Sequence, residues 1–286
     1  MHYVTSKSIL SAKNGMNIYR GCSHDCIYCD SRSQVYGMDH DFRDIEVKAN
    51  SLELLKKELL KRPQSMIGCG SMSDPYIPLE KELKYTQNAL KLIDRYGFGF
   101  TCITKSDLIL RDLDLLKKIN EKTKVVVQMT LTTADDDLSS ILEPGVCPTS
   151  MRVEVLKILD EANIPTVVWL CPILPYINDS EENINGIIDS CIDSNVYGII
   201  CFGMGLTLRR GNREYFYKKL DEHFPGLKDK YIKKYGDAYS LPSPDNRNLM
   251  NIFKKRTDDA CILNDNDEIF RYLSDFPQKS RQSKLI

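Results

Sequence analysis

Three cysteines, Cys22, Cys26 and Cys29, lie within eight residues of one another in a loop that reads GCSHDCIYCD. Thiolates are soft ligands, so such a loop suits a soft metal ion or an iron–sulfur cluster. Three cysteines on a cubane of four irons leave one iron without a protein ligand, and an open iron is a reaction site. Clusters that only transfer electrons normally have every iron ligated by protein. The spacing therefore indicates a cluster whose fourth iron binds a small molecule.

Zinc is the alternative metal for this loop. A closed structural zinc site needs four ligands, usually as two separated pairs of Cys or His, and no second pair lies nearby. His24, Asp25 or His40 would have to complete the set. Chance clustering of buried cysteines is less favoured, because polar residues separate them and the loop is expected to be exposed.

The other seven of the ten cysteines sit singly in or beside apolar runs, as small buried hydrophobic residues do. Ten are too few for a disulfide scaffold in 286 residues. Cys147, Cys191 and Cys261 are scattered, so a second cluster is not expected.

A repeated pattern of strands and helices must position the loop. Short apolar runs alternate with stretches of helical period between residues 16 and 204, as in repeated βα units around a parallel sheet. We expect six strands, near residues 16–20, 65–70, 98–104, 124–132, 165–172 and 197–204. We expect helices near residues 51–61, 80–95, 107–120, 149–162 and 181–194.

The runs VVVQM and TVVWLCPIL are almost wholly apolar, as expected when both faces of a parallel strand are covered. These features predict an α/β fold, a partial (β/α)6 barrel of the TIM type with a helical C-terminal extension. In such folds the site lies in the loops at the C-terminal ends of the strands. Polar segments occupy those positions at residues 21–30, 70–76, 104–106, 130–133, 172–179 and 203–207.

Composition and charge limit the remaining choices. The chain has 42% hydrophobic residues, a formal net charge of −1 and no apolar run near the roughly 20 residues that a membrane-spanning helix needs. The N-terminus does not read as a secretory signal. We therefore expect a cytoplasmic protein with no membrane partner and reduced thiols.

The sequence changes character after residue 207, so we divide the chain into a barrel, 1–207, and a basic helical extension, 208–286. Residues 209–256 contain 13 Lys or Arg against 6 Asp or Glu, together with several tyrosines. Such a segment could follow phosphates and stack bases of a nucleic acid. The alternative is a set of amphipathic helices, with Leu220, Phe224, Leu227 and Tyr231 on a core face. Residues 278–286 read as a loose tail.

Several motifs resemble one known family. The pattern Cys-x3-Cys-x-aromatic-Cys after the first strand resembles the radical S-adenosylmethionine (SAM) superfamily. The segments NIYRGCSHDCIYCD (17–30), SDPYIPLE (73–80), TKSDLILR (104–111), LTT (131–133) and ILEPG (141–145) are similar to its spore photoproduct lyase branch. The resemblance covers roughly residues 14–205.

The resemblance implies a role for each matching position. Cys22, Cys26 and Cys29 would hold a [4Fe-4S] cluster, and the amine and carboxylate of SAM would chelate the open iron. Reduction by an external donor such as flavodoxin or ferredoxin would cleave SAM to a 5′-deoxyadenosyl radical, which abstracts hydrogen from a substrate. The resemblance also names cofactor-binding candidates for each part of SAM. Tyr28, Leu174 and Met204 would lie beside the adenine. Lys105 and Thr130 would bind the carboxylate, and Gly70 and Ser71 would bind the amine.

Most of these positions also have a structural interpretation. Tyr28 would be a packed loop aromatic, Lys105 a solvated lysine, Thr130 a strand residue, and Leu174 and Met204 core residues. A cation such as Lys105 in a barrel mouth is costly unless it is paired, and the SAM carboxylate is a suitable partner.

The chain departs from the lyase pattern at one catalytic position. There the lyase has a cysteine that returns a hydrogen atom to the product, and Ser71 aligns with it. A hydroxyl is a far poorer hydrogen-atom donor than a thiol. Cys69, two residues earlier, could substitute, so Cys69 and Ser71 are the catalytic candidates; Cys102, Cys171 and Cys201 also lie on predicted strands.

The sequence thus predicts a radical SAM enzyme that acts on a substrate, with repair or modification of nucleic acid as the leading hypothesis. A small-molecule or peptide substrate is the main alternative within that class. The alternative from another class is a non-catalytic iron–sulfur or zinc binding module.

Overall fold

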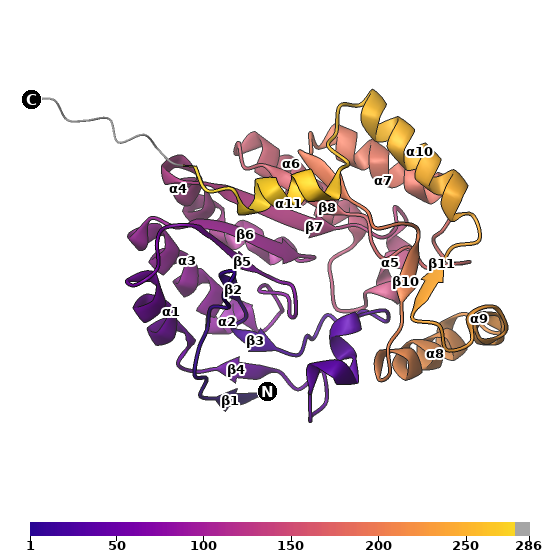
Figure 1. Ribbon diagram of the computed structural model, residues 1–286, viewed down its shortest axis with the longest axis horizontal. Coiled ribbons are helices and arrows are strands. Elements are labelled where there is room, and N and C mark those ends of the chain that lie inside the picture. Colours follow the sequence, from indigo (N-terminus) through magenta and orange to yellow (C-terminus); the bar gives the residue numbers. More distant parts are fainter. Residues whose placement is uncertain (278–286) are drawn as a thin grey trace, which may run out of the picture.

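A computed structural model describes residues 1–277 of the chain (Figure 1). Its main sheet has six parallel strands in the order β2-β5-β6-β7-β8-β9. The strands are β2 (Gly15–Met16), β5 (Met66–Cys69), β6 (Gly99–Thr104), β7 (Val125–Thr130), β8 (Thr166–Trp169) and β9 (Gly198–Ile200). β2 and β9 are its two edges. The predicted partial α/β barrel is confirmed.

Helices cover one face of this sheet and bury a continuous apolar core. They are α1 (Ser51–Leu59), α2 (Glu80–Leu83), α3 (Tyr85–Tyr96), α4 (Leu113–Lys122), α6 (Thr149–Glu161) and α7 (Glu181–Asp193). Val127 and Met129 of β7 pack in one cluster with Ile93 of α3 and Leu116 of α4. The strands are apolar along their whole length because helices bury this face and the opposite face is covered as well.

The other face of the sheet is covered by a helix from the far end of the chain. Figure 1 shows α11 (Asn266–Ser274) lying over this face, and Ile269 and Leu273 pack there against Val126, Val167 and Ile200. The preceding helix, α10 (Asn246–Asp259), packs beside α7. Of these two C-terminal helices, α11 therefore covers the open face of the sheet and α10 covers α7.

The strand predicted at residues 16–20 is wrong as a single element. The chain leaves the main sheet after β2 and enters a second sheet as β3 (Tyr19–Arg20), in the order β1-β4-β3. That side sheet also contains β1 (His2–Val4) and β4 (Glu46–Lys48). Lys48 of β4 donates its backbone N–H to the carbonyl of Ile18 at 3.1 Å and its Nζ to the carbonyl of Asn17 at 2.8 Å. These bonds hold the connecting residues at the side sheet.

The helix predicted at residues 80–95 is divided at Lys84, whose backbone is left-handed with φ +56°. The fully buried Glu80 causes the break, because its carboxylate accepts the N–H groups of Thr86 at 3.0 Å and Gln87 at 3.2 Å. These are unpaired donors in the first turn of α3. The helix predicted from residue 107 begins as a 3-10 helix, η3 (Asp107–Asp112). The structure also contains a short helix that was not predicted, α5 (Asp136–Leu142).

The basic segment forms α8 (Asn212–His223) and α9 (Leu227–Tyr235), with β11 (Ser240–Pro242) paired antiparallel to β10 (Gly205–Thr207). The amphipathic interpretation of this segment is confirmed. Leu220 and Tyr231 are fully buried, with Phe224 and Leu227 packed around them, in a cluster that also contains Tyr28. The extension therefore packs against the cysteine loop.

The tail predicted at residues 278–286 lies outside the described residues. In the part of the chain that the structure covers, no helix is both long and apolar enough to cross a membrane.

Candidate active site

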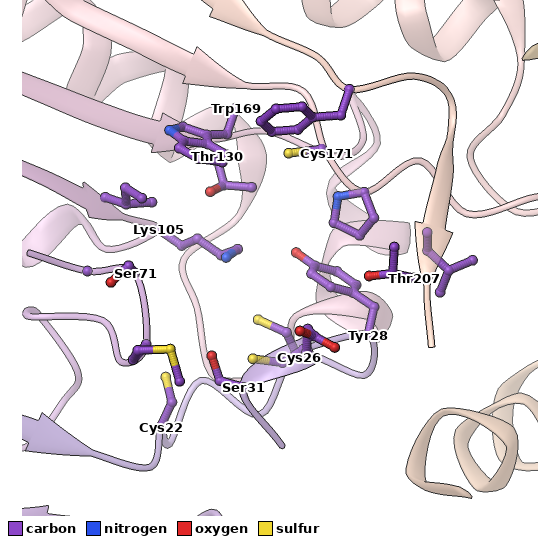
Figure 2. A pocket seen from close by; sticks show the side chains of 18 of the residues that line it. Cys22, Cys26, Tyr28, Ser31, Ser71, Lys105, Thr130, Trp169, Cys171 and Thr207 are labelled. Carbon is purple, nitrogen blue, oxygen red and sulfur yellow. The ribbon is translucent and has the colours of Figure 1, made fainter. Parts of the chain in front are cut away.

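A cavity of about 550 Å³ lies at the C-terminal edge of the main sheet. Figure 2 shows Cys22 and Cys26 on one side, Trp169 and Cys171 on the opposite side, and Lys105 and Thr130 between them. The loops after β5, β6, β8 and β9 contribute to its walls together with Thr130, the last residue of β7, as expected for a parallel barrel.

All three cysteines of the loop line this cavity. The expected exposure of the loop is wrong, because Cys22 and Cys26 are buried and Cys29 is half-buried. Two later segments cover it. The Ile27 N–H donates to the carbonyl of Leu142 at 2.9 Å, and Asn212 of α8 donates to the carbonyl of Tyr28 at 3.3 Å.

The spread of the three thiols favours a cluster over a single ion. Tetrahedral zinc would draw its sulfur ligands to about 3.8 Å from one another. The three thiols do not lie that close together. Within residues 1–277, His2, His40 and Glu46 form a group of potential ligand atoms that all lie within 4.8 Å of one another, whereas Cys22, Cys26 and Cys29 do not. The donor set of three spaced thiols around a cavity thus fits an iron–sulfur cluster.

The side chains proposed to complete a zinc site have other partners. The Nδ1 atom of His24 lies 3.3 Å from Asp74 Oδ2, and Asp25 pairs with Arg32 at 2.5 Å. His40 belongs to the separate group with His2 and Glu46. A zinc site at the cysteine loop is not supported.

Asp74 connects the cysteine loop to the loops after β5 and β6. Besides facing His24, its carboxylate accepts from the Tyr76 N–H at 2.8 Å, Thr104 Oγ1 at 2.8 Å and the Lys105 N–H at 2.9 Å. Burial alone would lower the pKa of His24, but Asp74 and Cys22 beside it raise this pKa to about 10. Burial would also raise the pKa of the Cys22 thiol, yet the adjacent His24 holds this pKa below its ordinary value. The sequence analysis considered His24 only as a zinc ligand and gave Asp74 no role.

Lys105 places a positive charge in the cavity. Its Nζ lies 5.9 Å from the centre of the Tyr28 ring, and within residues 1–277 it has no ion pair or hydrogen bond. Burial opposes the charge, but Cys26 and Glu143 nearby raise the lysine pKa above its ordinary value. An ammonium group held in this way calls for an anionic ligand.

A buried ion pair stands behind Tyr28. The Tyr28 hydroxyl donates to Glu143, and Glu143 Oε2 lies 2.5 Å from Arg152 Nη2, with neither charged side chain exposed. Arg152 also donates to the backbone carbonyls of Thr130 at 3.1 Å and Cys147 at 3.0 Å. The pair therefore joins the cysteine loop to the end of β7. Glu143 lies in the ILEPG segment, but no sequence signal marked Arg152.

The structure brings most of the predicted positions to the cavity. Tyr28, Gly70, Ser71, Lys105, Thr130 and Met204 all line it. Cys69 and Leu174 do not: Cys69 belongs to the main core, and Leu174 packs behind Cys26 and Tyr28. Of the cysteines on predicted strands, Cys171 lines the cavity, whereas Cys102 and Cys201 are buried in the core.

Aromatic residues that sequence reasoning missed form the wall opposite the cysteines. Trp169 and Phe202 line the cavity, and Phe270 of α11 lies beside them, with ring centres 6.0–6.3 Å apart. The Trp169 indole is fixed by a 2.8 Å hydrogen bond from Nε1 to Gln128. Phe202 is 63% exposed, which is unusual for a phenylalanine beside a cavity.

The fold and the site define a class: a partial α/β barrel whose cavity combines three spaced thiols with an unpaired ammonium group. The sequence model of the Radical SAM superfamily matches residues 16–185, and the chain belongs to that superfamily. Membership implies SAM and an iron–sulfur cluster as its cofactors.

Similar sequences come from archaea and bacteria. An uncharacterized protein of Methanocaldococcus jannaschii is 34% identical over 182 residues, covering 62% of this chain and 67% of that protein. An uncharacterized protein of Mycobacterium tuberculosis is 28% identical over 251 residues, covering 85% and 73%.

Two solved structures show the same fold. Spore photoproduct lyase complexed with dinucleoside spore photoproduct superposes with a TM-score of 0.62 at 14% identity, covering 90% of this chain and 78% of the lyase. The radical SAM methyltransferase TsrM of Kitasatospora setae, with tryptophan substrate and a SAM analogue, gives a TM-score of 0.50 at 14% identity, covering 68% and 36%. The chain therefore shares the fold of spore photoproduct lyase.

Proposed function

We propose that the protein is a radical SAM enzyme in which Cys22, Cys26 and Cys29 hold a [4Fe-4S] cluster beside a bound SAM. The observation that carries this proposal is the meeting of three thiols and the unpaired Lys105 ammonium at one cavity. When bound and reduced by an external donor, the cluster supplies the electron that cleaves SAM to methionine and a 5′-deoxyadenosyl radical, which abstracts hydrogen from a substrate.

The residues of the chain bind and orient SAM. Lys105 pairs with its carboxylate, and Thr130, whose side chain is 4% exposed, donates to the same group. Gly70 and Ser71 line the cavity where the amine would bind. Tyr28 and Met204 bound the adenine side, and Leu174 supports Tyr28 from behind.

The aromatic wall supports nucleic acid as the substrate. Bases stack on exposed aromatic rings whatever their sequence, and Phe202 presents such a ring at the cavity. The related lyase structure contains a dinucleoside photoproduct. The basic segment adds less support, because it buries Phe216 and Tyr231 and pairs Arg209 with Asp30 at 2.8 Å and Lys228 with Asp221 at 2.6 Å.

The same reaction as the lyase is not favoured. Ser71 stands in the cavity where the lyase pattern has a cysteine, and Cys69 is packed in the core. Modification or repair of a nucleic acid by hydrogen abstraction is the proposal that these residues support.

Product formation tests the enzyme class. The chain is reconstituted anaerobically with iron and sulfide, reduced with dithionite in the presence of SAM, and assayed for 5′-deoxyadenosine. We expect product from the wild type and from Cys261→Ala, which removes an exposed cysteine, and none from Cys26→Ala. A cluster that assembles but neither responds to SAM nor cleaves it would establish the non-catalytic binding module instead.

Binding of labelled oligonucleotides tests the substrate. We expect duplex or single-stranded DNA or RNA to bind with an affinity that falls steeply with salt. Phe202→Ala should weaken it about 5- to 100-fold, the loss of one stacked base. Tyr3→Ala, which removes another exposed aromatic ring from β1, should leave it unchanged. No binding at low salt would direct the search to peptides and small molecules.

A further inference from the structure

The side sheet carries a second group of metal-ligand side chains, away from the cavity. His2 of β1 and Glu46 of β4 are direct neighbours in the sheet register, and His40 comes from the loop before β4. Their ligand atoms all lie within 4.8 Å of one another. None of the three lines the cavity.

One hydrogen bond of the His40 ring fixes its tautomer. Its Nδ1 atom lies 3.0 Å from the backbone carbonyl of Asp41, which can only accept, so Nδ1 carries the proton. A neutral His40 therefore turns the lone pair of Nε2 toward Glu46.

The gap between His40 and Glu46 has the size of a shared cation. Nε2 lies 3.7 Å from Glu46 Oε2, too far for a hydrogen bond, and it is buried without a hydrogen-bond partner. Two electron-pair donors that face each other repel unless a cation lies between them. Two ligands of a tetrahedral zinc, each at about 2.0–2.1 Å from the metal, are roughly 3.3 Å apart.

A metal-binding histidine usually has a hydrogen-bond partner, such as a carboxylate, on its other ring nitrogen, and His2 has such a partner. Its Nδ1 lies 3.0 Å from Asp44 Oδ2, which leaves Nε2 free to bind a metal. A carboxylate behind a ligating imidazole orients the ring and raises its basicity. Arg20 also faces Glu46, but at 3.8 Å and with a 38% exposed side chain, so it competes weakly.

We infer that His2, His40 and Glu46 bind one divalent transition-metal ion of the zinc type, with water as its fourth ligand. Two imidazoles and one carboxylate suit zinc, whereas calcium and magnesium take oxygen ligands. The site lies on the segment that supports the cysteine loop, because the carbonyl of Phe42 accepts the N–H of Cys22 at 3.0 Å. The ion holds residues 40–46 in place and is independent of the chemistry proposed for the cavity.

Metal content after cluster reconstitution tests the inference, because the cysteines are then occupied. The full chain is incubated with a small excess of zinc, dialysed, and assayed for zinc by mass spectrometry. We expect one zinc per chain in the wild type and none in His40→Gln or Glu46→Gln. His223→Gln, which changes an exposed histidine of α8, should keep the ion.

Melting temperature gives a second readout that does not depend on dialysis. Zinc should raise it in the wild type and in His223→Gln but not in His40→Gln, provided that the variants show the same circular dichroism without metal. Absence of zinc from the wild type, or an equal amount in His40→Gln, would overturn the site. The variant in which Cys22, Cys26 and Cys29 are all replaced by Ala has no loop thiol that could bind zinc and should still bind the ion, so failure of the proposed enzyme function would leave this result unchanged.

Discussion

Glu143 and Arg152 form an ion pair with no exposed surface, and they connect Tyr28 to the strand end that carries Thr130. Burial would raise the pKa of Glu143, but Arg152 and Lys105 hold it below its ordinary value. The carboxylate is therefore charged at neutral pH. Removing its charge leaves the guanidinium buried without a counter-ion.

We expect Glu143→Gln to lower the free energy of unfolding by about 3–5 kcal/mol. Urea denaturation of the cluster-free protein measures it. Glu154→Gln, on the exposed side of the same helix as Arg152, serves as the control and should change stability by less than about 0.5 kcal/mol. Equal stability of the two variants would mean that the Glu143–Arg152 ion pair does not hold Tyr28 and the end of β7 together.

Lys105 is expected to supply the main charge for SAM binding. A hydrogen bond to a charged group contributes about 1.5–3 kcal/mol, so Lys105→Met should weaken SAM binding roughly 10- to 100-fold. Equilibrium dialysis of labelled SAM against the reconstituted protein measures this. Lys118→Met, on the exposed side of α4, should bind SAM like the wild type. An unchanged affinity in Lys105→Met would remove the proposed role of the ammonium.

His24 makes the stability of the cluster-free protein depend on pH. Its pKa is about 10 in the fold against about 6.5 in the unfolded chain, so the proton on folded His24 stabilises the protein fully below pH 6.5. This contribution is lost as the pH rises from 6.5 toward 10, by at most about 1.4 kcal/mol per pH unit. The lowered pKa of Cys22 opposes this trend in the wild type, so the comparison is made without that thiol: denaturation at pH 7, 8 and 9 should show a steeper decline for Cys22→Ala than for the double variant Cys22→Ala/His24→Gln. Parallel declines would show that the proton is not held.

At the scale of single residues, the sequence predicted positions that carry a recognisable pattern. The spacing of Cys22, Cys26 and Cys29, and for Lys105 the family resemblance, singled out these side chains, and the structure brings them together at the cavity. Arg152 could not be predicted, because its partner Glu143 is nine residues away on another element and the pairing depends on tertiary packing. Phe202 looks like an ordinary core residue in sequence, and only the fold shows that it is exposed.

Elements were predicted well where burial dominates. The apolar strands β6, β7 and β8 are covered on both faces, so composition alone identifies them. The two-residue strands β2 and β3 are too short for a periodic signal, and hydrogen bonds from β4 decide where the chain changes sheets. Glu80 divides a helix by a tertiary contact that no helical period reveals.

The break between α2 and α3 gives a prediction about backbone strain. Lys84 is exposed and adopts the left-handed conformation with φ +56°, which costs a residue with a Cβ atom roughly 1–2 kcal/mol. Lys84→Gly should therefore stabilise the protein by up to about 1 kcal/mol. Lys118→Gly, inside α4, should instead destabilise it by about 1 kcal/mol. Urea denaturation compares the two, and a loss of stability in Lys84→Gly would contradict this account.

The whole molecule depends on its C-terminal helices to cover the sheet. Ile269 of α11 is fully buried against Val126, Val167 and Ile200. Ile269→Ala should cost about 2–4 kcal/mol of unfolding free energy. Glu268→Ala, on the exposed side, should cost less than about 0.5 kcal/mol. If thermal and chemical unfolding show the same stability for both variants, α11 does not contribute to the core.

The covering of the cysteine loop by α8 has a consequence for biosynthesis. Asn212, which bonds to Tyr28, follows Cys29 by 183 residues, so the thiols leave the ribosome long before their cover exists. At about 5–20 residues per second, this interval lasts roughly 10–40 s. During that time the nascent loop is open to iron and sulfide carriers, and equally to oxidants. Cells that load the cluster during translation therefore meet an unfinished site that is open on all sides, whereas repair of a lost cluster in the mature protein has to reach the thiols through the cavity.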